Sequence, residues 1–201
     1  MQEEPEDLVV AAAQRGDLAA FNQLVTNHEQ RVYNLAYRML NDAEAAADAT
    51  QDAFFQAYRA LSQYRGGSFK SWLLRIASNI CYDRLRSRNR RPTTSLDEMI
   101  EEAEKVGGAD LGLLEDPGSD PLDFATRREL ARELAQALQS LPDEQRIVVI
   151  LSDVQGMSYD EIVYITGASL GTVKSRISRG RLKIREYLHK SKELLPGDLR
   201  Q

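Results

Sequence analysis

A run of hydroxyl and basic side chains near the C-terminus has the residue types that read duplex DNA. It comprises Thr172, Lys174, Ser175, Arg176, Arg179, Arg181 and Lys183. An arginine can bond guanine through two hydrogen bonds, and a serine or threonine hydroxyl can serve a base or a phosphate. The first residues of a recognition helix meet base edges, whereas later basic residues suit phosphates. The run therefore predicts binding to double-stranded DNA, and a solvated basic face on a plain helical hairpin is the alternative.

The elements that must position this run have the pattern of a helix-turn-helix. Ser158 and Glu161 form a capping box, in which each side chain satisfies a free amide at the start of a short helix. Gly167 ends that helix, and Ser169 opens a longer one that we expect to reach about Lys192. A short capped helix, a tight turn and a longer basic helix predict a helix-turn-helix in this part of the chain.

A second basic segment, residues 64–91, interleaves aromatic side chains with arginine and lysine. The aromatic residues are Tyr64, Phe69, Trp72 and Tyr82. Single-stranded nucleic acid is bound by such mixtures, because bases stack on the rings while cations neutralise the backbone. Ordinary core packing is the alternative for Phe69, Trp72 and Tyr82. The paired glycines Gly66 and Gly67 mark a loop just before a helix expected over Phe69 to Arg86.

A third feature lies on the helix expected over Ala43 to Leu61. Asp48, Gln51, Asp52 and Phe55 are spaced i, i+3, i+4 and i+7, which places them on one stripe. An exposed stripe that mixes carboxylates with an aromatic ring indicates a partner-binding surface. A solvated helix face with one stray phenylalanine is the alternative.

Charge and composition predict two domains and a linker. The chain of 201 residues has a net charge of −5, but its acids are concentrated in the middle. Residues 92–126 hold 10 acidic residues and one lysine, whereas residues 1–91 and 127–201 each hold a small excess of bases. Both flanking parts show helical periodicity, and no strand pattern is present. We therefore predict an all-α protein with two small helical domains, an N-terminal helical bundle and a C-terminal helix-turn-helix domain, joined by a long acidic linker over 92–126.

The sequence gives no support to several other classes of protein. Catalytic constellations and phosphate-binding loops are absent, and with one cysteine and two histidines a metal site is not expected. We therefore predict no enzymatic activity, no cofactor and no small-molecule substrate. No apolar run approaches the roughly 20 residues that a membrane span needs, and the first residues are acidic, unlike a signal peptide. A cytoplasmic location is the expectation, with Cys81 serving as a small buried hydrophobe.

Several motifs together resemble the RNA polymerase sigma factors of the extracytoplasmic-function (ECF) group. In the second half they are Leu141-Pro142-Asp143-Glu144, Gly156-Met157-Ser158-Tyr159-Asp160-Glu161-Ile162 and Gly171-Thr172-Val173-Lys174-Ser175-Arg176, which resemble region 4. In the first half, residues 42–58 resemble region 2.2 and residues 64–79 resemble the promoter-melting segment. The resemblance covers roughly residues 8–90 and 127–188, in the order of the family.

This resemblance implies a protein of transcription initiation and stress response that directs core RNA polymerase to promoter DNA and assists melting. The C-terminal run would read the −35 element as a duplex. The stripe Asp48, Gln51, Asp52 and Phe55 would dock on a coiled coil of the polymerase's largest subunit, and an anti-sigma factor would be a further partner. Single-stranded −10 DNA would be held by Tyr64, Arg65, Gly66, Ser68, Phe69, Lys70, Trp72, Arg75, Asn79 and Arg86.

The resemblance also implies that the loop from Tyr64 to Phe69, with Asn79 nearby, captures a base extruded from the non-template strand. The short glycine-rich sequence of this loop departs from the family pattern and leaves its base preference open. We further hypothesise that the acidic linker weakens DNA binding by the free protein. A conventional helix-turn-helix repressor or activator is the competing function, and it predicts tight binding by the free protein, usually to a palindrome.

Overall fold

The computed structural model describes residues 5–90 and 121–194, and these residues are helical with no β-strand among them. The prediction of an all-α fold is therefore confirmed. The chain divides into two compact units, with the main boundary after Arg90. Residues 92–120 of the predicted linker lie outside the described residues. None of the described helices is long and apolar enough to cross a membrane.

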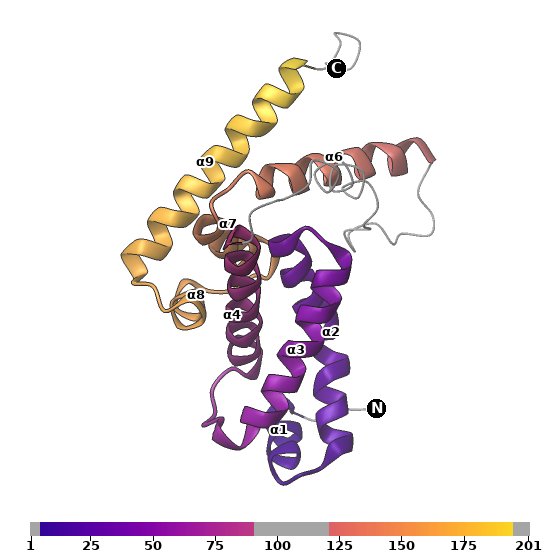
Figure 1. Ribbon diagram of the computed structural model, residues 1–201, viewed down its shortest axis with the longest axis vertical. Helices are drawn as coiled ribbons and strands as arrows, with labels where there is room; N and C mark the ends of the chain where they lie inside the picture. Colours follow the sequence, from indigo (N-terminus) through magenta and orange to yellow (C-terminus); the bar gives the residue numbers. More distant parts are fainter. Residues whose placement is uncertain (1–4, 91–120, 195–201) are drawn as a thin grey trace. The chain divides into compact units, whose positions relative to one another are not determined.

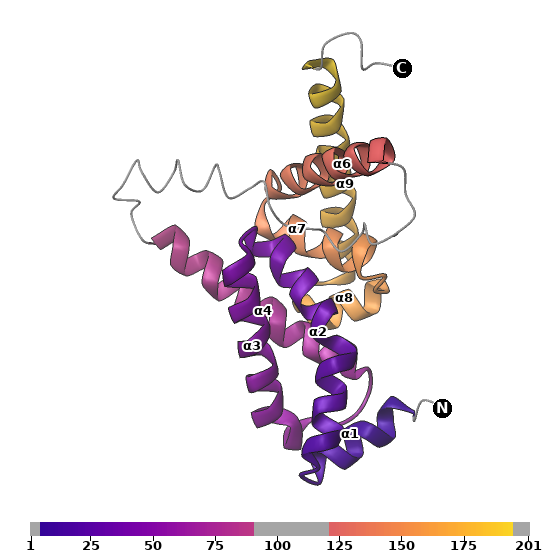
Figure 2. The same cartoon turned by 90° about the vertical axis from the view of Figure 1, so that its right-hand side faces the viewer.

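The first unit is a bundle built on three long helices. Its elements are α1 (Glu6–Gln14), α2 (Leu18–Leu40), α3 (Ala43–Ala60), the 3-10 turn η1 (Leu61–Gln63) and α4 (Phe69–Arg90). Helices α2, α3 and α4 lie side by side, and α1 lies at the end of the bundle where α3 ends (Figure 1, Figure 2). Fully buried side chains of α2 and α4, such as Leu24, Leu35 and Leu73, form the core.

Local signals in the sequence set the helix ends of this unit. The carboxylate of Asp17 accepts hydrogen bonds from the amides of Ala19 and Ala20 at 2.9 and 3.2 Å, which caps α2. Asn41 ends α2 in a left-handed conformation with φ of 55°, and Asp42 then caps α3. Helix α4 continues to Arg90, beyond its predicted end at Arg86.

The second unit consists of α6 (Pro121–Gln139), α7 (Asp143–Val149), the π-helical turn η2 (Ile150–Val154), α8 (Tyr159–Thr166) and α9 (Leu170–Leu194). Its core is made of aliphatic residues from α7 through α9, among them Ile147, Leu151, Ile162 and Ile177. Arg146 is buried in this unit. Its guanidinium donates to the carbonyls of Leu138, Gln139 and Leu141 at 2.9 to 3.0 Å and so satisfies the C-terminal end of α6 and the turn after it.

The structure corrects one predicted boundary. The composition predicts a linker that extends to residue 126, but α6 begins at Pro121. Proline is favoured at the first position of a helix, because its missing amide hydrogen would have no partner there. The acidic composition of the segment concealed this signal. Residues 121–126 therefore belong to the first helix of the second unit.

Candidate DNA and partner interfaces

The helix-turn-helix of the second unit is built as the capping signals predict. The amide of Ser158 donates to Glu161 Oε2 at 2.8 Å, and the amide of Glu161 donates to Ser158 Oγ at 3.3 Å. Gly167 has a φ of 69°, a left-handed conformation that turns the chain between α8 and α9. The Ser169 hydroxyl then accepts from the amide of Thr172 at 3.2 Å and caps α9. The predicted capping box is thus confirmed.

One face of α9 is anchored in the core, and the other carries the predicted DNA-reading side chains. Val173 and Ile177 are buried, and Gly180 lies directly against the side chain of Val149 in α7. Among the predicted reading residues, the exposed ones are Lys174, Arg179, Arg181 and Lys183, and the half-buried ones are Thr172, Ser175 and Arg176. The arrangement presents a basic helix on a rigid base, as duplex recognition requires.

Two carboxylates of the preceding elements hold two arginines of α9. Glu144 Oε2 of α7 accepts from Arg176 Nη2. Asp153 of η2 receives Arg181 Nε and Nη2 at 3.0 and 2.5 Å, and the Ser152 hydroxyl lies 3.3 Å from the same Nη2. The hydrogen bond from Arg181 lowers the pKa of Asp153, so the carboxylate is charged near neutral pH. Sequence reasoning missed both pairs, because 28 and 32 residues separate the partners.

Arg179 is oriented within α9 itself. Its Nε donates to the carbonyl of Ser175 at 3.1 Å, and its Nη2 donates to the Ser175 hydroxyl at 3.0 Å. Because Ser175 is used in this way, its hydroxyl and the Arg179 guanidinium form one polar group on the exposed face. A base or phosphate would therefore meet the two side chains together.

The predicted single-strand loop of the first unit is tightly bent. Gly66 and Gly67 have φ values of 93° and 95°, which side chains rarely tolerate. The Tyr64 hydroxyl donates to the carbonyl of Gly67 at 2.6 Å and closes the loop. Ser68 Oγ accepts from the amide of Ser71 at 3.1 Å and caps α4. The loop is thus held at its tip and at its exit.

Three aromatic rings gather beneath this loop. The Tyr64 ring lies 5.2 Å from the Trp72 ring and 5.8 Å from the Phe69 ring, measured between centroids. Phe69 is only 1% exposed, whereas Tyr64 and Trp72 are half-buried. The prediction that Phe69 contacts single-stranded DNA is therefore wrong. A ring with no exposed surface cannot stack on a base, and Phe69 instead supports the two rings that lie above it.

The predicted single-strand residues of α4 divide between two faces. Trp72, Arg75, Asn79 and Arg86 fall on one stripe of the helix, and the last three are exposed. Arg65, Gly66 and Ser68 are exposed in the loop that precedes this stripe. Lys70 lies on the opposite side of α4 and is half-buried. The structure therefore places Trp72, Arg75 and Asn79 next to the loop, with Arg86 farther along the same stripe, whereas Phe69 is buried and Lys70 faces away.

The predicted partner stripe on α3 is exposed along its length. Asp48, Gln51, Asp52 and Phe55 are all exposed, and the Phe55 side chain reaches 61%. Arg84 of α4 lies beside the stripe. Its Nη2 is 2.6 Å from Asp52 Oδ2, and its Nη1 is 3.8 Å from Asp48 Oδ2. The stripe therefore carries two carboxylates, whose negative charge Arg84 partly neutralises, next to an exposed aromatic ring.

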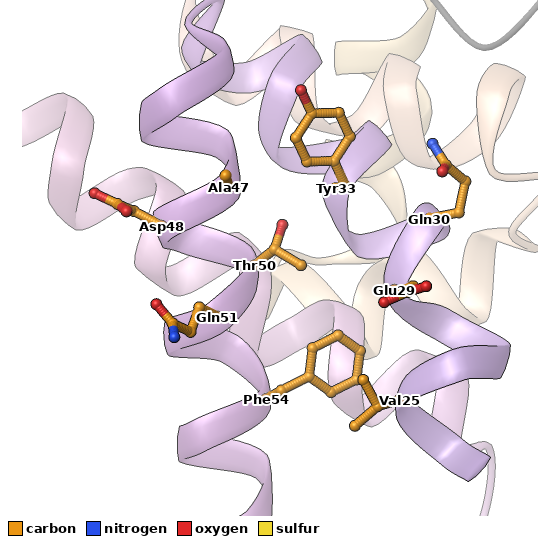
Figure 3. Close-up of a pocket in the computed structure, with 9 residues that line it drawn as sticks. All are labelled: Val25, Glu29, Gln30, Tyr33, Ala47, Asp48, Thr50, Gln51 and Phe54. Carbon is orange, nitrogen blue, oxygen red and sulfur yellow. The ribbon is translucent and has the colours of Figure 1, made fainter. Parts of the chain in front are cut away.

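A pocket of about 530 Å³ opens beside this stripe, between α2 and α3 (Figure 3). Asp48 and Gln51 line it from α3, and Glu29, Gln30 and Tyr33 line it from α2. Phe54 and Val25 point toward each other at one end of the pocket (Figure 3). Sequence reasoning missed the contribution of α2, because the hydrophobic periodicity of that helix identifies its buried face and not its neighbours.

The described residues offer neither a metal centre nor a reactive cysteine. Within residues 5–90 and 121–194, no group of three or more His, Cys, Asp or Glu side chains could hold a metal ion. Cys81 is buried, as predicted, and burial raises the pKa of its thiol to about 12. The thiol is therefore protonated at neutral pH and is a poor nucleophile.

The geometry defines a class of protein with a basic helix-turn-helix and a second helical unit that carries an aromatic and basic loop. Comparison with known families identifies that class. The family model for sigma-70 region 2 matches residues 24–91, and the model for sigma-70 region 4 matches residues 131–184. The chain belongs to the sigma-70 family of RNA polymerase sigma factors, which are transcription initiation factors and not enzymes.

Relatives of this chain include ECF members of that family. The chain is 39% identical over 178 residues to the ECF RNA polymerase sigma factor SigE of Mycolicibacterium smegmatis, a match that covers 87% of this chain and 65% of that relative. It is 38% identical over 189 residues to the RNA polymerase sigma-H factor of Pseudomonas aeruginosa, with 94% and 96% covered. The resemblance to the ECF group is therefore confirmed.

Solved structures agree with this assignment. The sigma factor RpoE in complex with the anti-sigma factor NepR from Bartonella quintana superposes with a TM-score of 0.62 at 26% identity, covering 84% of this chain and 96% of that one. CnrH in complex with the cytosolic domain of CnrY superposes with a TM-score of 0.66 at 24% identity, covering 93% and 99%. The second likeness supports the fold alone.

Proposed function

We propose that this sigma factor directs core RNA polymerase to specific promoters and also helps to melt them. The observation that carries the proposal is the presence, in one chain, of two different DNA-binding chemistries. Helix α9 offers a basic face for a duplex, and the loop at residues 64–68 offers aromatic rings and cations for a single strand. We assign these functions to residues 121–201 and 1–91, respectively.

In this proposal, α9 enters the major groove of the −35 element. Thr172, Lys174, Ser175 and Arg176 in its first turns face base edges, and Arg179 and Lys183 face phosphates. Arg176 is half-buried and bonded to Glu144, which fixes the position of its guanidinium. The remaining N–H groups of the guanidinium can then donate to a base. A fixed arginine loses less conformational freedom on binding than a free one.

The −10 element is held as a single strand at the loop and along α4. Tyr64 and Trp72 provide half-buried rings on which a base can stack, and Asn79 provides both a donor and an acceptor for a base edge. Arg65, Arg75 and Arg86 lie where the backbone of the strand would be neutralised. Melting is then favoured because the open strand gains contacts that the duplex cannot make.

The stripe on α3 is the proposed contact with core polymerase. Phe55 supplies exposed apolar area at one end of the stripe, and Asp48, Gln51 and Asp52 supply polar specificity beside it. The relative RpoE binds an anti-sigma factor in its crystal structure. We propose that a protein of that class also binds this chain and controls its access to polymerase.

Reconstitution with purified core polymerase tests the proposal. Mixed on a promoter library, the chain and core polymerase should produce discrete transcription start sites, and the footprint should cover an upstream duplex and an open region. The free chain should bind the same DNA weakly. If no RNA initiates and the free chain alone protects a palindromic site, the protein acts as a conventional helix-turn-helix regulator.

A further inference from the structure

Helix α1 ends against the entry of the single-strand loop. Gln14, its last residue, donates from one Nε2 to two backbone carbonyls, that of Leu61 at 3.0 Å and that of Tyr64 at 2.8 Å. These carbonyls stand at the start of η1 and at the first residue of the loop. Helix α1 lies outside residues 24–91, the part of the chain that the region 2 family model matches.

The other end of α1 is linked, through His28, to the aromatic residues that support the same loop. Glu6 Oε1 lies 2.6 Å from Nε2 of His28, which is buried in α2. The His28 ring packs on Phe69 with 5.5 Å between centroids, and Phe69 supports Tyr64 and Trp72. Helix α1 therefore contacts the loop directly through Gln14 and indirectly through the Glu6–His28 pair.

The loop needs such a support for a physical reason. Its tip consists of two glycines, which have the greatest backbone freedom of any residues. Its entry follows a 3-10 turn of only three residues, which is closed by the hydrogen bond from the Tyr64 amide to the Leu61 carbonyl at 3.1 Å. A mobile loop must lose this freedom when it binds a base, which costs free energy. A loop that is already fixed avoids this cost and binds more tightly and more selectively.

We propose that Gln14 is a positioning residue of the single-strand loop and sets its selectivity for the captured base. By fixing the carbonyls of Leu61 and Tyr64, the Gln14 amide sets the direction in which the Tyr64 ring leaves the backbone. The Tyr64 hydroxyl in turn closes the loop on Gly67. This inference rests on the proposed function of the loop in holding the −10 strand.

Three substitutions at Gln14 separate hydrogen-bond donation from size. Gln14→Glu keeps the shape but places an acceptor against the two carbonyl oxygens. Gln14→Met keeps the length and removes the donor, whereas Gln14→Lys restores a donor on a flexible stem. Gln23→Glu is the matched control, because Gln23 is exposed on α2 of the same unit and the substitution changes charge equally.

The measurement uses holoenzyme, assembled from core polymerase and the full chain. Its affinity is determined for four labelled single-stranded −10 oligonucleotides that differ only at the extruded base, with the sequence taken from the mapped promoters. We expect Gln14→Glu and Gln14→Met to reduce the discrimination between the best and worst base about tenfold. Gln14→Lys should recover most of it, and Gln23→Glu should leave it unchanged.

Two further readouts distinguish positioning from general stability. The unfolding midpoint of the chain and the affinity of the holoenzyme for a −35 duplex should be the same for wild type, Gln14→Met and Gln23→Glu. Wild-type discrimination in both Gln14→Glu and Gln14→Met overturns the inference, as does an equal loss for all four bases. If the wild-type holoenzyme itself shows no base preference, the proposed function of the loop fails instead.

Discussion

Arg181 in α9 and Asp153 in η2 form a two-point ion pair across the second unit. Arg181 Nε and Nη2 lie 3.0 and 2.5 Å from the two carboxylate oxygens of Asp153. The π-helical turn at Ile150–Val154 adds one residue to the usual helical repeat and so changes the direction of Asp153 relative to α7. The pair joins α9, the proposed DNA-reading helix, to the turn that follows α7 and so fixes the orientation of α9.

Asp153→Asn should destabilise the second unit in a pH-dependent manner. The hydrogen bond from Arg181 holds the pKa of Asp153 below its ordinary value of 3.8. A lowered carboxyl pKa stabilises the fold above that ordinary value, and the contribution disappears as the pH falls through the lowered pKa. Because both side chains are partly exposed, we expect a cost of about 0.5–1 kcal/mol at pH 7, which becomes smaller as the pH falls below 3.8.

Urea unfolding of the full chain at pH 7 and near pH 3 checks this expectation. The variants Asp153→Asn, Arg181→Gln and the double substitution form a cycle that isolates the pair from other effects. A coupling free energy of zero at pH 7 would show that the ion pair contributes nothing to stability. A coupling that is equal at both pH values would show that charge is not its source.

Arg176 and Lys183 should differ in what their removal does to −35 recognition. Arg176→Ala should weaken binding of the holoenzyme by ~1–3 kcal/mol on the preferred sequence and relax the preference at one base pair. Lys183→Ala should weaken binding by the same factor on every −35 sequence. It should also reduce the slope of log affinity against log salt concentration by about one, the contribution of one phosphate contact. Competition with a set of singly substituted −35 duplexes at two salt concentrations measures both. Uniform loss for Arg176→Ala would assign that residue to a phosphate.

Short-range features of this chain could be predicted from sequence, and long-range pairs could not. The caps at Ser158 and Ser169 are visible because donor and acceptor lie within three residues. The contacts Arg181–Asp153 and Gln14–Leu61 join residues 28 and 47 positions apart, and no periodicity encodes them. Phe69 was misplaced for a related reason. The residue type of Phe69 and its position at the start of a basic helix are the same whether its ring faces the core or the solvent.

Phe55→Ala should weaken binding to core polymerase without destabilising the fold. The ring is 61% exposed, so its removal leaves no cavity, whereas an anchor ring at an interface contributes about 2 kcal/mol or more to binding. Leu8→Ala is the matched control, since Leu8 is 58% exposed on α1 of the same unit. Affinity for fluorescently labelled core polymerase and the unfolding midpoint are measured for each. Equal affinity of the two variants for polymerase would remove the α3 stripe as the docking surface.

Gly180 and Val149 form a very close approach between α9 and α7, and substitutions there should be strongly coupled. A Cβ atom added at Gly180 would lie 2.6 Å from Val149 Cγ2, so one of the helices or the valine must move. Gly180→Ala gains about 1 kcal/mol in helix propensity but loses about 1–3 kcal/mol through overpacking, and we expect a net loss.

Combining Gly180→Ala with Val149→Ala tests whether the two residues are in tight contact. Val149→Ala alone removes two methyl groups from a buried site and should destabilise the unit. In the double variant the methyl group added at position 180 fills part of that space, so the double variant should be more stable than the sum of the single effects by about 0.5 kcal/mol or more.

Gly171→Ala is the control on the same helix, because a Cβ there meets no atom within 4 Å, and it should stabilise the chain. Urea unfolding gives all four free energies, and additive effects at positions 149 and 180 would show that α7 and α9 are not in tight contact at this point.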